Sequence, residues 1–232
     1  VKGERYFIEW EKSDADGKYY FYLPAGSDLS SVETKFVADK AVYVGEKKLG
    51  YEKKTDAFAG GGEFTVTCGS DSYQVVVLQS ENLPAMFIET QSGSLEAIHA
   101  DKSHKEKGTI SVLENGEVTV DSKLSSIKGR GNSTWALPKK PYNIKLESKS
   151  KLFGMEKAKS WCFIANYEDK SLIRNQVTYG LGAAVGMEES PDCRNADVYI
   201  NGEYKGVYLI TEKVEINKNR VDIYDLEEAT ED

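Results

Sequence analysis

Residues 126–145, SIKGRGNSTWALPKKPYNIK, hold the side chains of this chain that are best suited to bind a phosphate group. Gly129 and Gly131 flank Arg130, and glycine allows a backbone to approach a ligand more closely than other residues do. Donor-rich loops of this kind can cradle phosphate oxygens. The same pattern also fits a tight turn at a strand end, so the motif alone leaves ligand contact open. The further donors of this stretch are Asn132, Ser133, Thr134 and Lys145.

Lys145 belongs to a strand that the string KKPYNIKL predicts. Alternation along a strand places Asn143 and Lys145 on one face, while Tyr142, Ile144 and Leu146 fall on the other. We expect Lys145 to face inward on this strand, where its ammonium group can meet a ligand. The alternative is an exposed lysine on a solvated sheet face, which the string alone favours.

Composition limits the classes of partner. The chain of 232 residues is acidic, with a net charge of -8 and a pI near 5.1. This charge argues against general binding to nucleic acid or to anionic membranes. No apolar run is long enough to predict a membrane span. The three cysteines show no metal-ligand spacing, so we expect small buried side chains and no metal site: Cys68, Cys162 and Cys193.

Residues 1–82 read as short strands separated by turn signals such as Gly60-Gly61-Gly62. Apolar, β-branched and aromatic residues alternate or run together in each strand. Several short strands at close spacing favour a β-sandwich of immunoglobulin-like type. No catalytic constellation appears in this unit, which we interpret as a spacer or recognition module. The predicted strands are 19–23, 32–37, 41–44, 62–67 and 73–78.

Pro84 predicts the boundary of a second unit, residues 83–232, because proline disfavours helix at the residue before it. The dipeptides Asn115-Gly116 and Asn201-Gly202 predict two tight hairpins. One helix is predicted over residues 171–185, begun by Asp169 and ended by Gly186. The fold class is thus mainly β with minor α. The predicted strands are 86–89, 108–113, 117–120, one ending at Lys128, 141–146, 160–165, 196–200, 206–211 and 220–224.

Four unusual strings follow one another in this second unit: GRGNSTW, KKPYNIKL, ANYEDKSLIRN and NGEYKGVYLITEKV. Together they resemble the CotH family of spore-coat atypical protein kinases. The resemblance runs from about Leu83 to the C-terminus, and residues 1–82 have no part in it. It implies a kinase N-lobe-like antiparallel sheet with one main helix.

The resemblance also implies roles for particular residues. Lys145 would pair with the α- and β-phosphates of ATP, as the strand lysine of kinases does. The segment LITEKV would form the hinge, where backbone groups of Glu212 and Lys213 meet the adenine edge. The glycine turn would contact phosphate oxygens through Gly129, Arg130, Gly131, Asn132 and Ser133. The side chains in both segments have a plainer alternative, which is a satisfied turn and solvated charges.

The acidic partner of Lys145 departs from the ordinary kinase pattern. A helix glutamate is expected there, yet the predicted helix 171–185 contains neither Asp nor Glu. Only Glu168 and Asp169 lie near its start, and either fits a helix cap equally well.

The resemblance implies ATP with Mg²⁺ or Mn²⁺ as cofactor and protein Ser or Thr as acceptor, in a secreted or bacterial cell-surface protein. The metal-binding acids of such kinases belong to the larger lobe, after the hinge. We therefore expect no catalytic residue in this chain and no transfer activity from it alone. The alternative is a non-catalytic surface module that binds carbohydrate or protein through tyrosine rings: Tyr19, Tyr20, Tyr22, Tyr43, Tyr51 and Tyr73.

Overall fold

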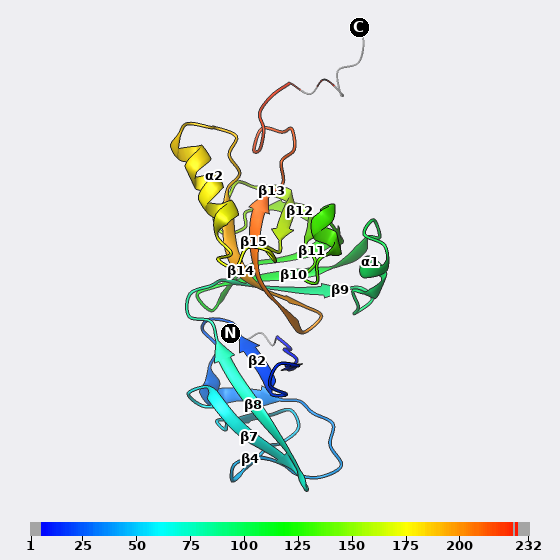
Figure 1. Ribbon diagram of the computed structural model, residues 1–232, viewed down its shortest axis with the longest axis vertical. Helices are drawn as coiled ribbons and strands as arrows, with labels where there is room; N and C mark the ends of the chain where they lie inside the picture. The colour runs from blue at the N-terminus through cyan, green and yellow to red at the C-terminus, as the bar shows by residue number, and fades with distance from the viewer. Residues whose placement is uncertain (1–5, 225, 227–232) are drawn as a thin grey trace.

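The computed structural model describes residues 6–224 and Leu226. The fold is mainly β, and its strands belong to two separate systems stacked along the long axis of the molecule (Figure 1). All strands from residues 11 to 79 form one unit, and all strands from residues 85 to 212 form the other. Within the described residues, no helix is long and apolar enough to cross a membrane.

The N-terminal unit consists of two sheets of unequal size. Six strands form the larger sheet in the order β1-β2-β8-β7-β4-β5, and β2 runs parallel to β8. The smaller sheet contains only β3 and β6. The unit is β-structured as expected, while its immunoglobulin-like type stays a prediction. Its elements are β1 (Glu11–Lys12), β2 (Tyr19–Leu23), η1 (Leu29–Ser31), β3 (Val32–Thr34), β4 (Val42–Val44), β5 (Lys47–Lys48), β6 (Lys53–Thr55), β7 (Gly62–Cys68) and β8 (Asp71–Gln79).

The second unit is a closed barrel of seven strands in the order β10-β11-β12-β13-β15-β14-β9. Neighbouring strands are antiparallel except β14 and β9, which are parallel. The predicted antiparallel sheet therefore closes on itself through one parallel pair. A closed sheet has no free edge strand. The strands are β9 (Ala85–Thr90), β10 (Glu106–Glu114), β11 (Glu117–Gly129), β12 (Tyr142–Ser150), β13 (Ala158–Ile164), β14 (Cys193–Ile200) and β15 (Glu203–Glu212).

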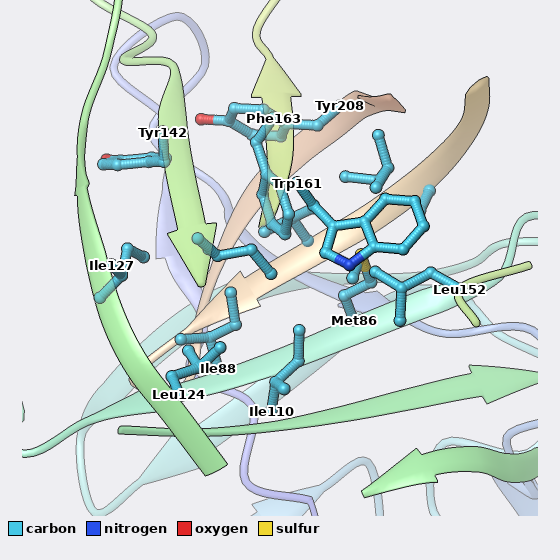
Figure 2. Close-up of a cluster of buried hydrophobic side chains, with 14 of the residues drawn as sticks. Met86, Ile88, Ile110, Leu124, Ile127, Tyr142, Leu152, Trp161, Phe163 and Tyr208 are labelled. Atoms are coloured by element: carbon cyan, nitrogen blue, oxygen red, sulfur yellow. The ribbon is translucent and has the colours of Figure 1, made fainter. Parts of the chain in front are cut away.

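The barrel interior is filled with apolar side chains that alternate along each strand (Figure 2). Trp161 and Phe163 of β13 are fully buried there, and Ile144 of β12 is only 2% exposed. This inward set confirms the predicted apolar face of the KKPYNIKL strand. Since side chains of a strand alternate between faces, the residues between the buried ones must point out of the barrel.

Both hairpins turn at the predicted asparagine-glycine pairs. Asn115 and Gly116 have φ angles of 53° and 79°, and Asn201 and Gly202 have 52° and 83°. Two successive positive φ angles are the mark of the tight turn that suits the twist of antiparallel strands. These two turns set the registers of β10 with β11 and of β14 with β15.

Three elements differ from the sequence prediction. A short helix, α1 (Glu96–Ala100), was not predicted; it carries Ile98 into the barrel core. One long strand, β11, replaces the two that were predicted between residues 117 and 128. The strand predicted at 220–224 is wrong, because only an isolated bridge joins Ile216 to Val221 there.

The main helix, α2 (Arg174–Ala184), begins later than predicted. Asp169 still supports its start, because its carboxylate accepts hydrogen bonds from the Ser171 hydroxyl at 2.6 Å and from the Arg174 N–H at 2.8 Å. The Ser171 hydroxyl first, and then the Arg174 N–H, lower the pKa of Asp169. Gly186 follows the helix at φ 85°, as predicted.

The two units meet through aromatic rings and one buried carboxylate. The ring of Tyr22 from β2 stacks on Tyr204 from β15, with centroids 4.6 Å apart. Asp197 of β14 is 1% exposed and accepts hydrogen bonds from the Ser80 and Tyr204 hydroxyls. A buried carboxylate is tolerated only where it is hydrogen-bonded, so these contacts attach the N-terminal unit to the barrel.

Candidate functional site

The glycine turn follows β11 and leads into the short helix η2 (Ser133–Ala136). Gly129 is buried, and a Cβ atom there would lie 2.6 Å from the ring of Trp135. Glycine is therefore required at this position by packing against the indole ring, and Gly129 itself does not face solvent. This packing holds the turn against the barrel.

Gly131 is the second glycine of the turn and has a φ of 83°, which favours glycine. Its carbonyl accepts a hydrogen bond from the Lys102 ammonium at 2.6 Å. Asn132 and Ser133 follow with exposed side chains, and the Asn132 carbonyl accepts from the Trp135 N–H at 3.1 Å. The turn is thus internally bonded and leaves two polar side chains at its surface.

The lysine pair of KKPYNIKL does not form a solvated basic face. The Lys139 ammonium donates to the carbonyl of Val207 and lies 4.3 Å from the centroid of the Tyr208 ring. Burial lowers the pKa of Lys139 to about 8. Lys140 donates to the Trp135 carbonyl at 2.7 Å. The Lys139 side chain therefore fastens the turn to β15, and the Lys140 side chain holds it against η2.

A row of outward-pointing side chains crosses five neighbouring strands of the barrel. Each member sits beside the next in the strand register, and each alternates with a core residue on its own strand. Such cross-strand neighbours on one face lie close together. This outer row consists of Lys128, Asn143, Cys162, Thr211 and Cys193.

Arg130 lies on the same outer face as this row. Its N–H donates to the Pro141 carbonyl at 3.2 Å, which keeps it beside β12. Burial raises the pKa of the Cys162 thiol, and the neighbouring guanidinium of Arg130 opposes that rise. Burial also raises the pKa of Tyr179 from α2, again opposed by Arg130. The guanidinium therefore lies between the outer row and α2.

Two amide side chains at this face carry buried oxygens without a partner among the described residues. They are Oδ1 of Asn143 and Oδ1 of Asn195. Asn195 lies on β14 under α2, and its amide donates to Gln176 at 2.9 Å. An unsatisfied buried polar atom costs free energy, so these amides are the places where a ligand or a water would gain a hydrogen bond.

Lys145 occupies β12 two residues after Asn143, on the same outer face. Its side chain is exposed, so the expectation that it faces inward is wrong. Among the described residues, it has no ion pair or side-chain hydrogen bond. Lys145 lies four positions after Pro141, which is beside Arg130, and this is roughly 13 Å along an extended strand. Arg130 and Lys145 therefore share one face, with Asn143 between them.

No acidic partner of Lys145 emerges among the described residues. Asp169 is occupied by the start of α2, as its hydrogen bonds show. The helix itself contributes amides to the barrel contact, since Asn175 donates to Asn166 at 2.7 Å and Gln176 accepts from Asn195.

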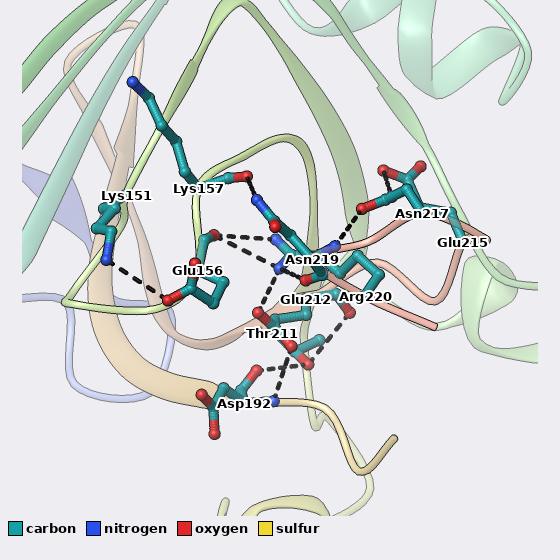
Figure 3. Close-up of polar contacts among 10 residues, drawn as sticks. All are labelled: Lys151, Glu156, Lys157, Asp192, Thr211, Glu212, Glu215, Asn217, Asn219 and Arg220. Atoms are coloured by element: carbon teal, nitrogen blue, oxygen red, sulfur yellow. Dashed lines mark hydrogen bonds and ion pairs between the residues drawn. The ribbon is translucent and has the colours of Figure 1, made fainter. Parts of the chain in front are cut away.

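The segment after β15 folds back on the barrel through a buried ion pair (Figure 3). Arg220 pairs with Glu212, and their side chains are 2% and 13% exposed. The guanidinium also lies 4.8 Å from the centroid of the Trp161 ring. Burial raises the pKa of Glu212 in spite of this pairing. Glu212 thus holds the predicted hinge in place through its side chain.

Lys213 is the second predicted hinge residue and lies beside the outer row. Its ammonium pairs with Glu215 at 3.2 Å, and its charge acts on the Cys162 thiol. The backbone N–H of Glu212 donates to the Asp192 carbonyl at 3.1 Å. The N–H of Glu212 is thus engaged by Asp192, whereas the N–H of Lys213 takes no part in that hydrogen bond.

Sequence reasoning missed several members of this site. Cys162 was predicted only as a small buried side chain, and it is buried. Thr211 was predicted only as a strand residue, and Asn195 and Arg220 were given no role. The signal for the first two was available, because each alternates with apolar residues along its own strand. The signal for Arg220 was not, since its ion pair with Glu212 depends on the turn that replaces the predicted strand.

The similarity to known proteins falls on the part of the chain that contains this site. A family model described as CotH kinase protein matches residues 127–230. No curated protein matches the chain significantly. The matched residues include the glycine turn, the outer row and the segment after β15. Over residues 127–230, which is somewhat less than half of its length, the chain is similar to the CotH kinase family.

Proposed function

We propose that the outer face of the barrel binds the polyphosphate of ATP, as part of a CotH-like protein kinase. The observation that carries the proposal is Asn143, an amide with an unpaired oxygen that lies between Arg130 and Lys145. An amide offers both a donor and an acceptor, and rotating it exchanges the two. A phosphate chain over Asn143 would meet a cation at each end.

The two cations suit different parts of such a ligand. Arg130 presents a planar fork that can bind two phosphate oxygens at once, and its backbone position is fixed beside Pro141. Lys145 is exposed and unpaired among the described residues, so it can act as a mobile point charge. Asn132 and Ser133, exposed beside Arg130, add further donors at the turn.

The base of the nucleotide is assigned to the segment after β15. We place the adenine edge at the backbone of Lys213, because the N–H of Glu212 is already engaged by Asp192. Thr211 and Cys162 form the floor between this segment and Asn143. The ligand would therefore extend across β13 from the hinge to the glycine turn.

The described residues fit the phosphates better than they fit a metal ion. Within residues 6–224 and Leu226, no group of three or more His, Cys, Asp or Glu side chains is placed to hold a metal. The CotH resemblance supports these ions, a protein Ser or Thr acceptor, and a secreted or bacterial cell-surface setting as proposals.

Isothermal titration calorimetry with ATP and Mg²⁺ tests the proposal. Loss of one charged hydrogen-bonding group weakens binding by about tenfold or more, so Arg130→Ala and Lys145→Ala should each do so. The matched controls are Arg194→Ala and Lys149→Ala. Arg194 lies opposite the inward-facing Ile210 in the strand register, and Lys149 lies further along β12 than Lys145. Both control variants should therefore bind ATP like the parent chain. Equal affinity of all four variants would contradict the proposal.

The alternative, a carbohydrate-binding module, gains little from the placement of the tyrosines. Tyr19 and Tyr73 pack toward the core of the N-terminal unit, and Tyr22 stacks on Tyr204 between the units. Tyr51 is half exposed and packs edge-on against Phe36. A glycan panel in the same calorimetric experiment distinguishes the two functions. Glycan affinity that Lys145→Ala leaves unchanged would favour the alternative.

A further inference from the structure

A cavity of about 470 Å³ lies inside the N-terminal unit, away from the outer row of the barrel. Side chains from the larger sheet form its floor, and the smaller sheet and nearby loops form its cover. The segment of residues 6–10 lies along one side. Its apolar walls come mainly from Phe21, Leu23, Val42, Val66, Val75 and Val77 of the larger sheet.

The unequal sheets explain why the cavity exists. Six strands present an apolar inner face, but β3 and β6 are three residues long each and cover little of it. Phe36, Leu49 and Phe58 add cover from the loops. In sandwiches with two full sheets, side chains from both inner faces fill the space between them. Here part of that space stays open.

The lining of the cavity suits hydrocarbon. None of the buried polar side-chain atoms that lack a partner in the described part of the chain belongs to this unit. A cavity without such atoms gives water too few partners and tends to stay dry or to take an apolar molecule. Its size falls within the range of ligand pockets, which are mostly apolar. A sugar would instead bury hydroxyl groups here without partners.

Charge is confined to the rim of the cavity. Lys35 lies there with an exposed side chain, in a long ion pair of 3.7 Å with Glu52. Trp10, at 45% exposure, and Phe7, at 51%, stand at the rim formed by residues 6–10. The arrangement is an apolar interior whose mouth carries one cation, Lys35, together with the carboxylates of Glu9 and Glu33 and two exposed rings.

We propose that this cavity binds the acyl chain of a fatty acid or lipid, with the carboxylate or headgroup at the rim near Lys35. The inference concerns a second site and does not depend on nucleotide binding by the barrel. An acyl chain needs no hydrogen bond along its length, which matches the walls. Its single polar end matches a rim that carries the only charged groups of the lining: Glu9, Glu33 and Lys35.

Displacement of a fluorescent fatty acid by dodecanoate tests the site. Leu23→Trp places a large ring in the cavity, while Leu78→Trp makes the same substitution on the next strand at an exposed position. Excluding even two methylene groups weakens binding about tenfold, so Leu23→Trp should lose at least that much affinity. Leu78→Trp should bind like the parent chain, with one ligand per chain.

Circular dichroism establishes that both variants are folded before binding is compared. If Leu23→Trp fails to fold, Lys35→Ala and the rise in melting temperature of the parent chain on adding dodecanoate take its place. Absence of binding and of any thermal shift in the parent chain would overturn the proposal. So would affinity that Leu23→Trp leaves unchanged.

Two further arms identify the source of the acyl chain and exclude another occupant. Sedimentation with phosphatidylcholine vesicles that Leu23→Trp abolishes would identify a membrane lipid, and binding of free dodecanoate alone would identify a fatty acid; both support the site. Analytical ultracentrifugation tests whether a second copy of the chain fills the cavity. A dimer that Leu23→Trp disrupts and dodecanoate does not would overturn the proposal.

Discussion

The two units of this chain treat their apolar faces in opposite ways. The barrel closes its sheet and buries Trp161, Phe163 and their neighbours almost completely. The N-terminal unit pairs six strands with two and leaves a cavity of about 470 Å³ over its inner face. Two buried amide oxygens without a partner among the described residues lie on the outer face of the barrel, at Asn143 and Asn195; the other two such atoms are Trp161 Nε1 in the core and Arg220 Nε. The chain thus offers a charged ligand an outer surface and an apolar ligand an interior.

Because of this difference, each unit can bind a ligand at a different place without losing its fold. A filled barrel has no room for a ligand inside, so its chemistry lies in the residues that alternate with the core. An incompletely covered sheet can take a ligand against the core itself, because some of its side chains lack neighbours on one side.

The largest expected effect is the truncation of a phenylalanine in the filled core. Phe163→Ala should cost about 3–5 kcal/mol of unfolding free energy, because it leaves a cavity in a closed barrel. Phe58 lines the existing cavity, so its side chain already has fewer neighbours. Phe58→Ala should therefore cost less unfolding free energy than Phe163→Ala. Urea denaturation followed by circular dichroism measures both, and equal costs would remove the contrast between the cores.

Ion pairs give the second contrast. Arg220→Ala leaves Glu212 buried without its partner and should cost about 3 kcal/mol or more. The pair of Lys47 and Asp56 in the N-terminal unit is exposed on both sides, so Lys47→Ala should leave the melting temperature unchanged. The double variant Arg220→Met with Glu212→Gln should recover much of the loss. If the double variant did not recover the lost unfolding free energy, the contact of Arg220 with the Trp161 ring, and not its ion pair with Glu212, would be what stabilises the fold.

Two glycine-to-alanine changes test the packing of the turn. Gly129→Ala should destabilise the barrel by about 1–3 kcal/mol, because its Cβ would meet the Trp135 ring at 2.6 Å. Gly180→Ala, in α2 with nothing within 4 Å, should stabilise by about 0.5–1 kcal/mol. Thermal melts distinguish the two. A neutral Gly129→Ala would mean that the turn is not held by Trp135.

The smallest effect is a dependence on pH at the barrel end that carries α1. Burial, with the charges of Lys205 and Lys140, lowers the pKa of His99 below its ordinary value of 6.5. The unfolded chain therefore takes up a proton before the folded chain does, and stability falls as pH drops below about 6.5. Its Nε2 lies 2.8 Å from the Tyr142 hydroxyl.

His99→Gln should flatten this part of the stability curve, measured by urea denaturation between pH 5 and 8. A slope that survives His99→Gln would assign the titration to another group.

Local chemistry accounts for most of what the sequence could predict. The asparagine-glycine turns and the alternation of KKPYNIKL depend on neighbours in the chain, and both are confirmed. Asp169 bonds to the start of α2, although the N-cap position is Ile173. The parallel pairing of β14 with β9 depends on residues more than a hundred positions apart. A five-residue helix such as α1 is too short to be stable alone, so only its packing of Ile98 into the barrel produces it.

The candidate site divides in the same way. The outward face shared by Asn143 and Lys145 followed from alternation, but its direction relative to the barrel did not. Gly129 looked like a position for ligand approach and is instead filled by Trp135. The cavity of the N-terminal unit could not be foreseen, because it results from the number of strands in each sheet. Sequence periodicity says which face is apolar and does not say how much of it is covered.

Amide chemical shifts measured during titration with ATP and, separately, with dodecanoate test the contrast most directly. The account predicts that ATP moves resonances of the outer face, around residues 128–130, 143–145, 162 and 211–213, and leaves the N-terminal unit unchanged. Dodecanoate should move residues of β2, β7 and β8 and leave the outer face unchanged. Shifts in the same residues with both ligands, or none with ATP at Arg130 and Lys145, would contradict it.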